Sequence, residues 1–159
     1  MSGLLLNAPI ALDALGWDAV ARLGGATAAG LLLGVDREVR GHGPGLRTHA
    51  IICFSTALLT VASIALYLQL GGPEARLDPL RVIEGTAAMV GVMAGALIVF
   101  SKGEVKNLTT AAHLWLAAAI GITFGAGQYP LALMGIGVAV VLLTVLRAVE
   151  QRAPERDDG

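Results

Sequence analysis

The chain has 159 residues, of which 55% are hydrophobic and only 14% are charged, and its formal net charge is −1. Since soluble domains carry about 25% charged residues, this composition excludes an ordinary soluble domain and indicates an integral membrane protein. The basic residues follow the predicted topology instead of forming one patch, which excludes a nucleic-acid partner and leaves the lipid bilayer as the expected one. The sequence also lacks the spacings of metal-binding Cys and His, of phosphate-binding loops and of nucleophile elbows, so we expect no enzyme, no catalytic residue and no organic cofactor.

The N-terminal segment 1–18 is expected to lie at the membrane interface, with Trp17 as an anchor. A disordered tail is the alternative for this segment. No basic residue precedes Arg22, so the positively charged start of a cleavable signal peptide is missing.

An all-α membrane domain is predicted over residues 19–147. A membrane helix needs about 20 predominantly apolar residues, and the sequence GAGQYP at 125–130 divides a longer apolar stretch with Gly and Pro. About five transmembrane helices are therefore expected, at about 19–35, 49–70, 83–101, 108–125 and 130–147. The charged segment 148–159 is expected to be a disordered cytoplasmic tail.

The Lys and Arg residues predict the orientation of these helices. Eight of the eleven fall in the loop 36–48, the loop 102–107 and the C-terminal segment, which five spans place on one side. The positive-inside rule then puts the C-terminus in the cytoplasm and the N-terminus outside. A four-span alternative, in which the first segment only lies on the surface, leaves the later loops on the same sides.

Small residues recur every four positions in three of the expected helices. Such ladders allow close helix packing, either within one bundle or as the seam of a homodimer. The three ladders are Ala26, Gly30 and Gly34; Ala87, Gly91 and Gly95; and Ala117, Gly121 and Gly125.

The stretch DREVRGHGPGLRTH at 36–49 concentrates charge between two apolar segments. If this stretch is an ordinary topology anchor, its arginines are explained but its acids and histidines are not. A functional polar face is therefore the second interpretation. We expect Thr48 to cap the following helix and Asn107 to cap the helix that begins after the loop 102–107. The residues expected to form this face are Asp36, Arg37, Glu38, Arg40, Arg47, Thr48, His49, Asn107, Thr109 and Thr110.

The acids of these loops suggest one ion. Mg²⁺ prefers carboxylate oxygens and retained waters, which Asp36, Glu38 and Glu104 are able to supply. The neighbouring arginines favour an alternative, in which an ion-paired network shapes a docking surface.

Four polar residues near or within the spans form a second candidate group, an ion path made of Asp78, Arg81, Glu84 and His113. A histidine inside a span is costly unless it is paired. His113 is therefore either hydrogen-bonded to a neighbouring helix or part of the path. Glu84 follows Arg81 by three positions, so it either pairs with Arg81 or lines an ion entry on the external side.

Three motifs resemble the MgtC/SapB family over about 24–146. They are GLLLGVDREVRGHGPGLRTHAIICFSTALLTVAS at 30–63, DPLRVIEG at 78–85 and GEVKNLTTAAHLWLAAAIGITFGAG at 103–127. By this resemblance the motif positions include Asp36, Arg37, Glu38, Gly45, Leu46, Arg47, Thr48, Asp78, Arg81, Thr109, Thr110 and Trp115.

This sequence departs from the family pattern at several positions. Glu84 stands where the family has Gln, Asn107 where it has Gly, and His113 where it has a small residue. The third apolar segment, MVGVMAGA at 89–96, keeps fewer glycines than the family's run.

The resemblance implies a bacterial inner-membrane protein associated with growth in low magnesium and, in pathogens, with survival inside host cells. It leads to two hypotheses. In the first, the chain is a non-enzymatic modulator of other membrane machinery, such as ATP synthase, and acts through its polar face and glycine seams. In the second, it is a small transporter or channel subunit for Mg²⁺ or another ion, with Glu84 and His113 lining the path.

Overall fold

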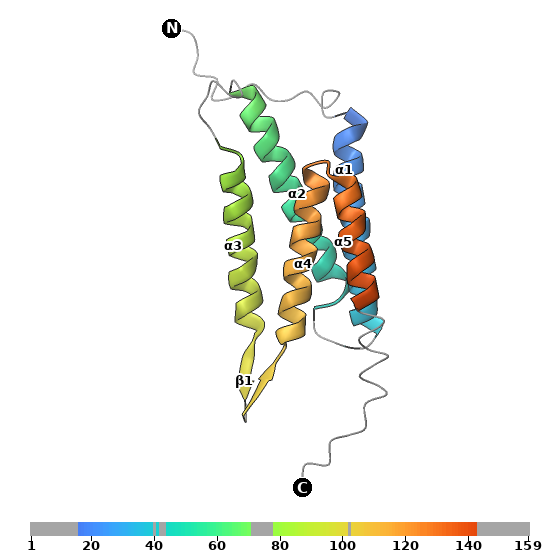
Figure 1. Ribbon diagram of the computed structural model, residues 1–159, viewed down its shortest axis with the longest axis vertical. Helices are drawn as coiled ribbons and strands as arrows, with labels where there is room; N and C mark the ends of the chain where they lie inside the picture. Colours follow the sequence, from blue (N-terminus) through green and yellow to red (C-terminus); the bar gives the residue numbers. More distant parts are fainter. Residues whose placement is uncertain (1–15, 40, 42–43, 71–77, 102, 143–159) are drawn as a thin grey trace.

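The computed structural model describes residues 16–39, 41, 44–70, 78–101 and 103–142. In this part of the chain five helices run alternately up and down: α1 (Gly16–Val39), α2 (Leu46–Gln69), α3 (Leu80–Leu97), α4 (Leu108–Gly125) and α5 (Tyr129–Val141). A short hairpin of β1 (Val99–Ser101) and β2 (Glu104–Lys106) extends below the bundle between α3 and α4 (Figure 1).

The helices have the apolar surface of a membrane protein. Helices α1 to α4 are each long and apolar enough to cross a membrane, while α5 has 13 described residues and is shorter. The predicted all-α membrane fold is confirmed. Trp17, expected in a separate interfacial segment, lies in the first turn of α1 and is 88% exposed. Most of the predicted segment 1–18 and the whole tail 148–159 lie outside the described residues.

The hairpin corrects the predicted third span, which was expected to continue to residue 101. Helix α3 ends at Leu97, and Ile98 already has an extended backbone (ψ 120°). Phe100 then pairs with Val105 across the antiparallel strands, and Gly103 (φ +85°) allows the chain to reverse. A short apolar run with β-branched and aromatic residues suits a strand as well as a helix, so hydropathy alone missed this hairpin.

Helix α2 is the centre of the bundle because two glycine ladders meet its backbone. On one side Gly30 and Gly34 of α1 approach it so closely that an added Cβ would lie 2.7 Å from Ala50 Cα or 2.6 Å from Leu46 Cα. Any side chain at these positions would push the two helices apart. The first ladder therefore serves helix packing within the chain.

The ladder of α4 meets the other side of α2 in the same way. A Cβ added at Gly121 would lie 2.9 Å from Cys53 Cα, and one at Gly125 would lie 2.9 Å from Ala57 Cα. The close approach also allows hydrogen bonds between the helices, because Cys53 Sγ donates to Ala117 O at 3.0 Å. Small residues thus bring three helices together without large side chains between them.

The third ladder behaves differently. A Cβ at Gly95 would meet nothing within 4 Å, and one at Gly91 would meet only Trp115 Nε1, at 3.9 Å. Of the residues of α3, only Val90 and Ala94 are buried. Helix α3 thus lies at the edge of the bundle, as Figure 1 shows. Because the other two ladders pack against α2, the predicted homodimer seam remains a prediction for the ladder of α3 alone.

Candidate functional site

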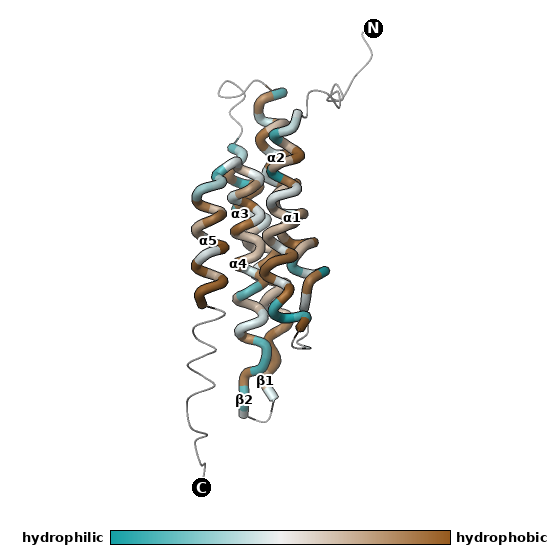
Figure 2. Tube along the Cα trace, turned by 90° about the vertical axis from the view of Figure 1, so that its right-hand side faces the viewer, coloured by the Kyte–Doolittle hydropathy of each residue, from teal (hydrophilic) through white to brown (hydrophobic). Residues whose placement is uncertain are grey.

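The two polar stretches singled out in the sequence come together at one end of the bundle. We call this region the polar end and define it as the described residues of 36–49 and 101–110, together with His113. It combines the end of α1, the start of α2, the hairpin and the start of α4 (Figure 1). In Figure 2, hydrophilic segments appear at this end, below helices whose middle parts are mostly hydrophobic.

Arg37 is the residue that joins the two stretches. Although it lies in the last turn of α1, it continues the buried face of Leu33 and Gly34 and is only 8% exposed. Its Nη2 donates to Thr110 Oγ1 at 2.5 Å, and its Nη1 donates to His113 Nδ1 at 3.2 Å. A buried charge is costly unless hydrogen bonds satisfy it. These bonds therefore make Arg37 a link between α1 and α4, beyond the topology anchor that its sequence position suggests.

His49 lies in the first turns of α2 and is completely buried. Its Nδ1 lies 2.9 Å from Gly45 O, in the turn between α1 and α2. Its other ring nitrogen, Nε2, is buried and has no hydrogen-bond partner in the described part of the chain. Since most buried polar atoms do have partners, this nitrogen requires an explanation.

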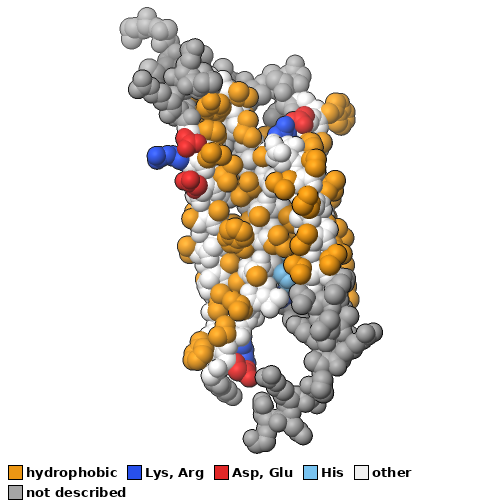
Figure 3. Space-filling model, viewed as in Figure 1, with side chains coloured by type: hydrophobic (Ala, Val, Ile, Leu, Met, Phe, Trp, Pro, Cys, Tyr) orange, Lys and Arg blue, Asp and Glu red, His pale blue; other side chains and the backbone are white. Residues whose placement is uncertain are grey.

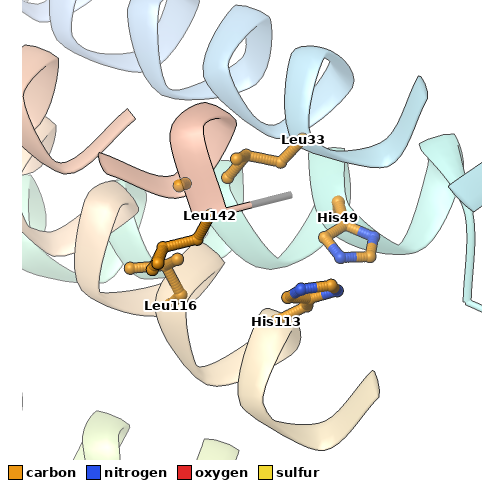
Figure 4. Close-up of a pocket in the computed structure, with 6 residues that line it drawn as sticks. Leu33, His49, His113, Leu116 and Leu142 are labelled. Atoms are coloured by element: carbon orange, nitrogen blue, oxygen red, sulfur yellow. The ribbon is translucent and has the colours of Figure 1, made fainter. Parts of the chain in front are cut away.

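A cavity of about 50 Å³ adjoins His49. Its lining residues come from four helices and are Leu33, His49, His113, Leu116, Ala139 and Leu142. Figure 4 shows the rings of His49, on α2, and His113, on α4, next to each other at one side of this space. The leucines give the rest of the cavity an apolar wall.

The turn between α1 and α2 is stabilised by Glu38 and not by Thr48. Helix α2 begins at Leu46, so Thr48 lies inside the helix and the predicted cap is wrong. Instead Glu38 Oε2 accepts a hydrogen bond from Leu46 N at 3.1 Å. Gly45 lies so close to this carboxylate that a Cβ there would collide with it. The carboxylate of Glu38 therefore caps the start of α2 from a position eight residues earlier in the chain.

The other members of the predicted face are placed as follows. Asp36 is partly buried, and Arg47 is exposed. Thr109 is exposed, in contrast to the buried Thr110. Arg40 lies outside the described residues.

Asn107 occupies the predicted capping position but does not cap α4. Its backbone is left-handed (φ +64°), and its side chain makes no capping bond. Nδ2 instead donates to Leu97 O at 3.0 Å, at the end of α3. Asn is one of the few non-glycine residues that adopt this conformation readily. Asn107 thus ties together the two ends of the hairpin connection.

The predicted ion path is not gathered into one place. Asp78, Arg81 and Glu84 are all exposed, near the start of α3, and no ion pair joins Arg81 to Glu84. Figure 3 shows charged side chains near the start of α3 and near the hairpin, separated by a largely hydrophobic surface. A groove of about 490 Å³ includes Asp78 and Arg81, but neither Glu84 nor His113. The cavity that His113 lines does not include Glu84 either.

Metal ligands are likewise scattered. The described residues contain no group of three or more His, Cys, Asp and Glu side chains suited to a metal ion. In particular, Asp36, Glu38 and Glu104 do not form such a group.

One polar contact was not anticipated from the sequence. At the opposite end of the bundle, Arg22 Nη1 donates to Gly125 O at 2.9 Å, where the last carbonyls of α4 need partners. Arg22 Nε also pairs with Asp18 Oδ2 at 2.6 Å, and Tyr129 OH donates to Asp18 Oδ1 at 3.2 Å. The spacing of Asp18 and Arg22, one helical turn apart, predicts their pair, but no local pattern predicts the contact with α4.

The comparisons with known proteins agree on one family. The model of the MgtC family matches residues 23–152. The putative magnesium transporter YhiD of Escherichia coli K12 is 33% identical over 121 residues, which are 76% of this chain and 56% of that protein. Protein SapB of Bacillus subtilis is 36% identical over 114 residues, 70% of this chain and 49% of that protein.

A third relative is more distant. Protein MgtC of Salmonella typhimurium LT2 is 29% identical over 123 residues, 77% of this chain and 50% of that protein. The chain thus matches about half the length of these relatives. No solved structure matches it. The family match covers most of the chain, including every element of the polar end, and the chain belongs to the MgtC family.

Proposed function

We propose that this chain is a non-enzymatic modulator of another protein in a bacterial inner membrane, with a role in magnesium or ion homeostasis. The link to magnesium rests on the family and on the name of the YhiD relative. The observation that carries the modulator role is the separation of Glu84 from His113. An ion path through the chain needs its polar groups along one cavity, and in the described part Glu84 is exposed near one end while His113 is at the other.

The polar end has the properties of a docking surface. Arg37 and Thr110 are buried and hold the helices together, so they provide a rigid support. The exposed residues of this end include Arg47, Glu104, Lys106 and Thr109. The hairpin adds an apolar pair, Phe100 and Val105. Phe100 and Val105 share one face of the hairpin, while Glu104 and Lys106 point to the other. Aromatic residues are enriched at protein interfaces, which have a polar rim. By the positive-inside rule, this surface faces the cytoplasm.

Transport remains the second candidate because the YhiD relative is named a putative magnesium transporter. Flux measurements separate the two functions. The purified chain, shown to be helical, is placed in proteoliposomes that contain a fluorescent Mg²⁺ reporter, with Glu84→Gln as the paired variant. The modulator predicts no flux above that of empty vesicles. Mg²⁺ flux that Glu84→Gln abolishes would overturn it.

A growth assay tests the docking surface directly. In a bacterium whose growth in low magnesium depends on this chain, the double variant Arg47→Ala, Lys106→Ala is compared with Arg81→Ala, an exposed residue at the opposite end. We expect only the double variant to lose growth, at equal protein levels in the membrane. Full growth of the double variant would contradict a role for this surface.

A further inference from the structure

We infer that the cavity beside His49 and His113 is a binding site for a small neutral molecule that donates and accepts a hydrogen bond, and that its occupant is water. The first reason is size. A cavity needs about 10–15 Å³ of accessible space to hold one water molecule, and this one has about 50 Å³. The second reason is His49, which lines the cavity and whose buried Nε2 has no hydrogen-bond partner in the described residues.

The hydrogen bonds of His49 fix which of its nitrogens carries a proton. Its Nδ1 lies 2.9 Å from Gly45 O, and a carbonyl oxygen only accepts. Nδ1 therefore carries the hydrogen. In the neutral ring Nε2 then has a lone pair, so the cavity receives an acceptor from His49.

His113 has the opposite arrangement. Its Nδ1 lies 3.2 Å from Nη1 of Arg37, and a guanidinium only donates. Nδ1 of His113 must accept, so the hydrogen of the neutral ring is on Nε2. The ring nitrogen of His113 that Arg37 leaves for the cavity is therefore a donor, and the two histidines are held as opposite tautomers by partners outside the cavity.

An acceptor and a donor at one cavity select the class of ligand. A cation would be repelled by the positive charge of Arg37. A metal bound to His113 Nε2 would force the hydrogen onto Nδ1, where it would point at the guanidinium, which is also a donor. An anion would meet the lone pair of His49 Nε2, beside leucine walls. A water molecule instead donates to His49 and accepts from His113, and it satisfies both rings.

This water completes a hydrogen-bonded connection through the polar end. The connection runs from Thr110 and Arg37 to His113, then through the water to His49 and the carbonyl of Gly45. It joins α4 and α1 to α2 and the turn before it.

Nuclear magnetic resonance of the whole chain in lipid nanodiscs, with ¹⁵N-labelled histidine, tests the site. Ring nitrogen shifts report the tautomers, and magnetisation transfer from water to the rings reports the bound molecule. We expect a hydrogen on Nδ1 of His49 and on Nε2 of His113, with water transfer to both rings. Identical tautomers for the two rings, or no transfer from water to either, would overturn the proposal.

A filled cavity provides the matched control. Ala139 lines the cavity and is 1% exposed, so Ala139→Leu places methyl groups in the space and leaves both histidines unchanged. Val138→Leu, an exposed position on the same helix, serves as the comparison. Loss of water transfer in Ala139→Leu alone supports the site, and unchanged transfer in both variants contradicts it.

A titration with Zn²⁺ tests the metal alternative in the unaltered protein. If Zn²⁺ shifts the resonances of both histidine rings, the cavity is a metal site instead and the proposal is overturned.

Discussion

The guanidinium of Arg37 donates a hydrogen bond to the hydroxyl of Thr110, across 73 positions of the sequence. This bond is buried, and it makes one structural unit of two polar stretches that the sequence presents separately. It also divides the polar end into two kinds of residue. Arg37 and Thr110 hold the helices in place, while Arg47 and Thr109 are exposed and remain available to a partner.

Loss of the Arg37 side-chain charge should destabilise the bundle. Arg37→Met keeps an apolar stem of similar length but removes the donor to Thr110 and His113. Because partners that are left buried and unsatisfied cost about 1–3 kcal/mol each, we expect the free energy of unfolding to fall by about 2–3 kcal/mol. Unfolding in mixed detergent micelles, followed by circular dichroism, measures this change. Arg47→Met, at an exposed position, should change it by no more than about 0.5 kcal/mol, and equal losses would contradict the structural role of Arg37.

An added methyl group should lower the stability of the protein where α4 packs against α2, and raise it on the open face of α3. In Gly125→Ala the new Cβ would lie 2.7 Å from Thr60 Cβ, so the helices must separate. Overpacking of this kind costs about 1–3 kcal/mol. Gly95→Ala meets nothing within 4 Å and should gain about 0.5–1 kcal/mol from its higher helix propensity. The same micelle unfolding assay compares the two variants, and a Gly125→Ala protein as stable as the unaltered chain would show that this contact is not tight.

The free ladder on α3 allows a direct test of the predicted homodimer. If α3 packs against a second copy, Gly95→Leu should shift the protein in lipid nanodiscs or mild detergent from dimer to monomer, because a large side chain prevents close approach. Gly137→Leu on α5, where a Cβ also meets nothing within 4 Å, is the matched variant. Light scattering of the purified protein measures the oligomeric state. A monomer in all three proteins would rule out this seam under those conditions.

Glu38 should control the start of α2. Glu38→Ala removes the acceptor of Leu46 N, and the loss of a helix cap costs about 0.5–2 kcal/mol. We expect the amide hydrogen of Leu46 to exchange faster, with little change in the middle of α2. Hydrogen exchange read by mass spectrometry measures this local opening, and Thr48→Ala is the comparison because Thr48 has no capping role here. Slow exchange in both variants would show that Glu38 contributes nothing to the turn.

Hydropathy predicted the membrane helices well because their length and composition carry that information locally. It failed at Val99–Ser101, where three residues of a strand are as apolar as the helix before them. Spacing by four identified the ladders of α1 and α4, which pack closely, but it did not show which helix each one meets or that the ladder of α3 lacks such a contact. That choice depends on contacts such as Gly30 with Ala50, which are set by the assembled bundle.

The candidate site was less predictable than the fold, for a related reason. Arg37 has the sequence position of an ordinary cytoplasmic anchor, and only the register of α1 shows that it continues the face of Leu33. His49 and His113 were both noted as unusual. Their opposite tautomers nevertheless depend on Gly45 and Arg37, and the contact of Arg37 with His113 joins residues 76 positions apart.

The position of α2 between α1 and α4 has a consequence for biogenesis. Its partner α4 is made after α3, so α2 enters the lipid before the carbonyl of Ala118, which later accepts from Thr56 at 3.2 Å, is present. Acceptors within α2 itself are also in reach, because Thr56 Oγ1 lies 2.9 Å from Ile52 O and Thr60 Oγ1 lies 2.8 Å from Thr56 O, so these hydroxyls have partners before α4 is present. Hydroxyls satisfied in this way cost little in hydrocarbon. The side chains that later join α2 to α4 can thus cross into the bilayer during synthesis without waiting for their final neighbour.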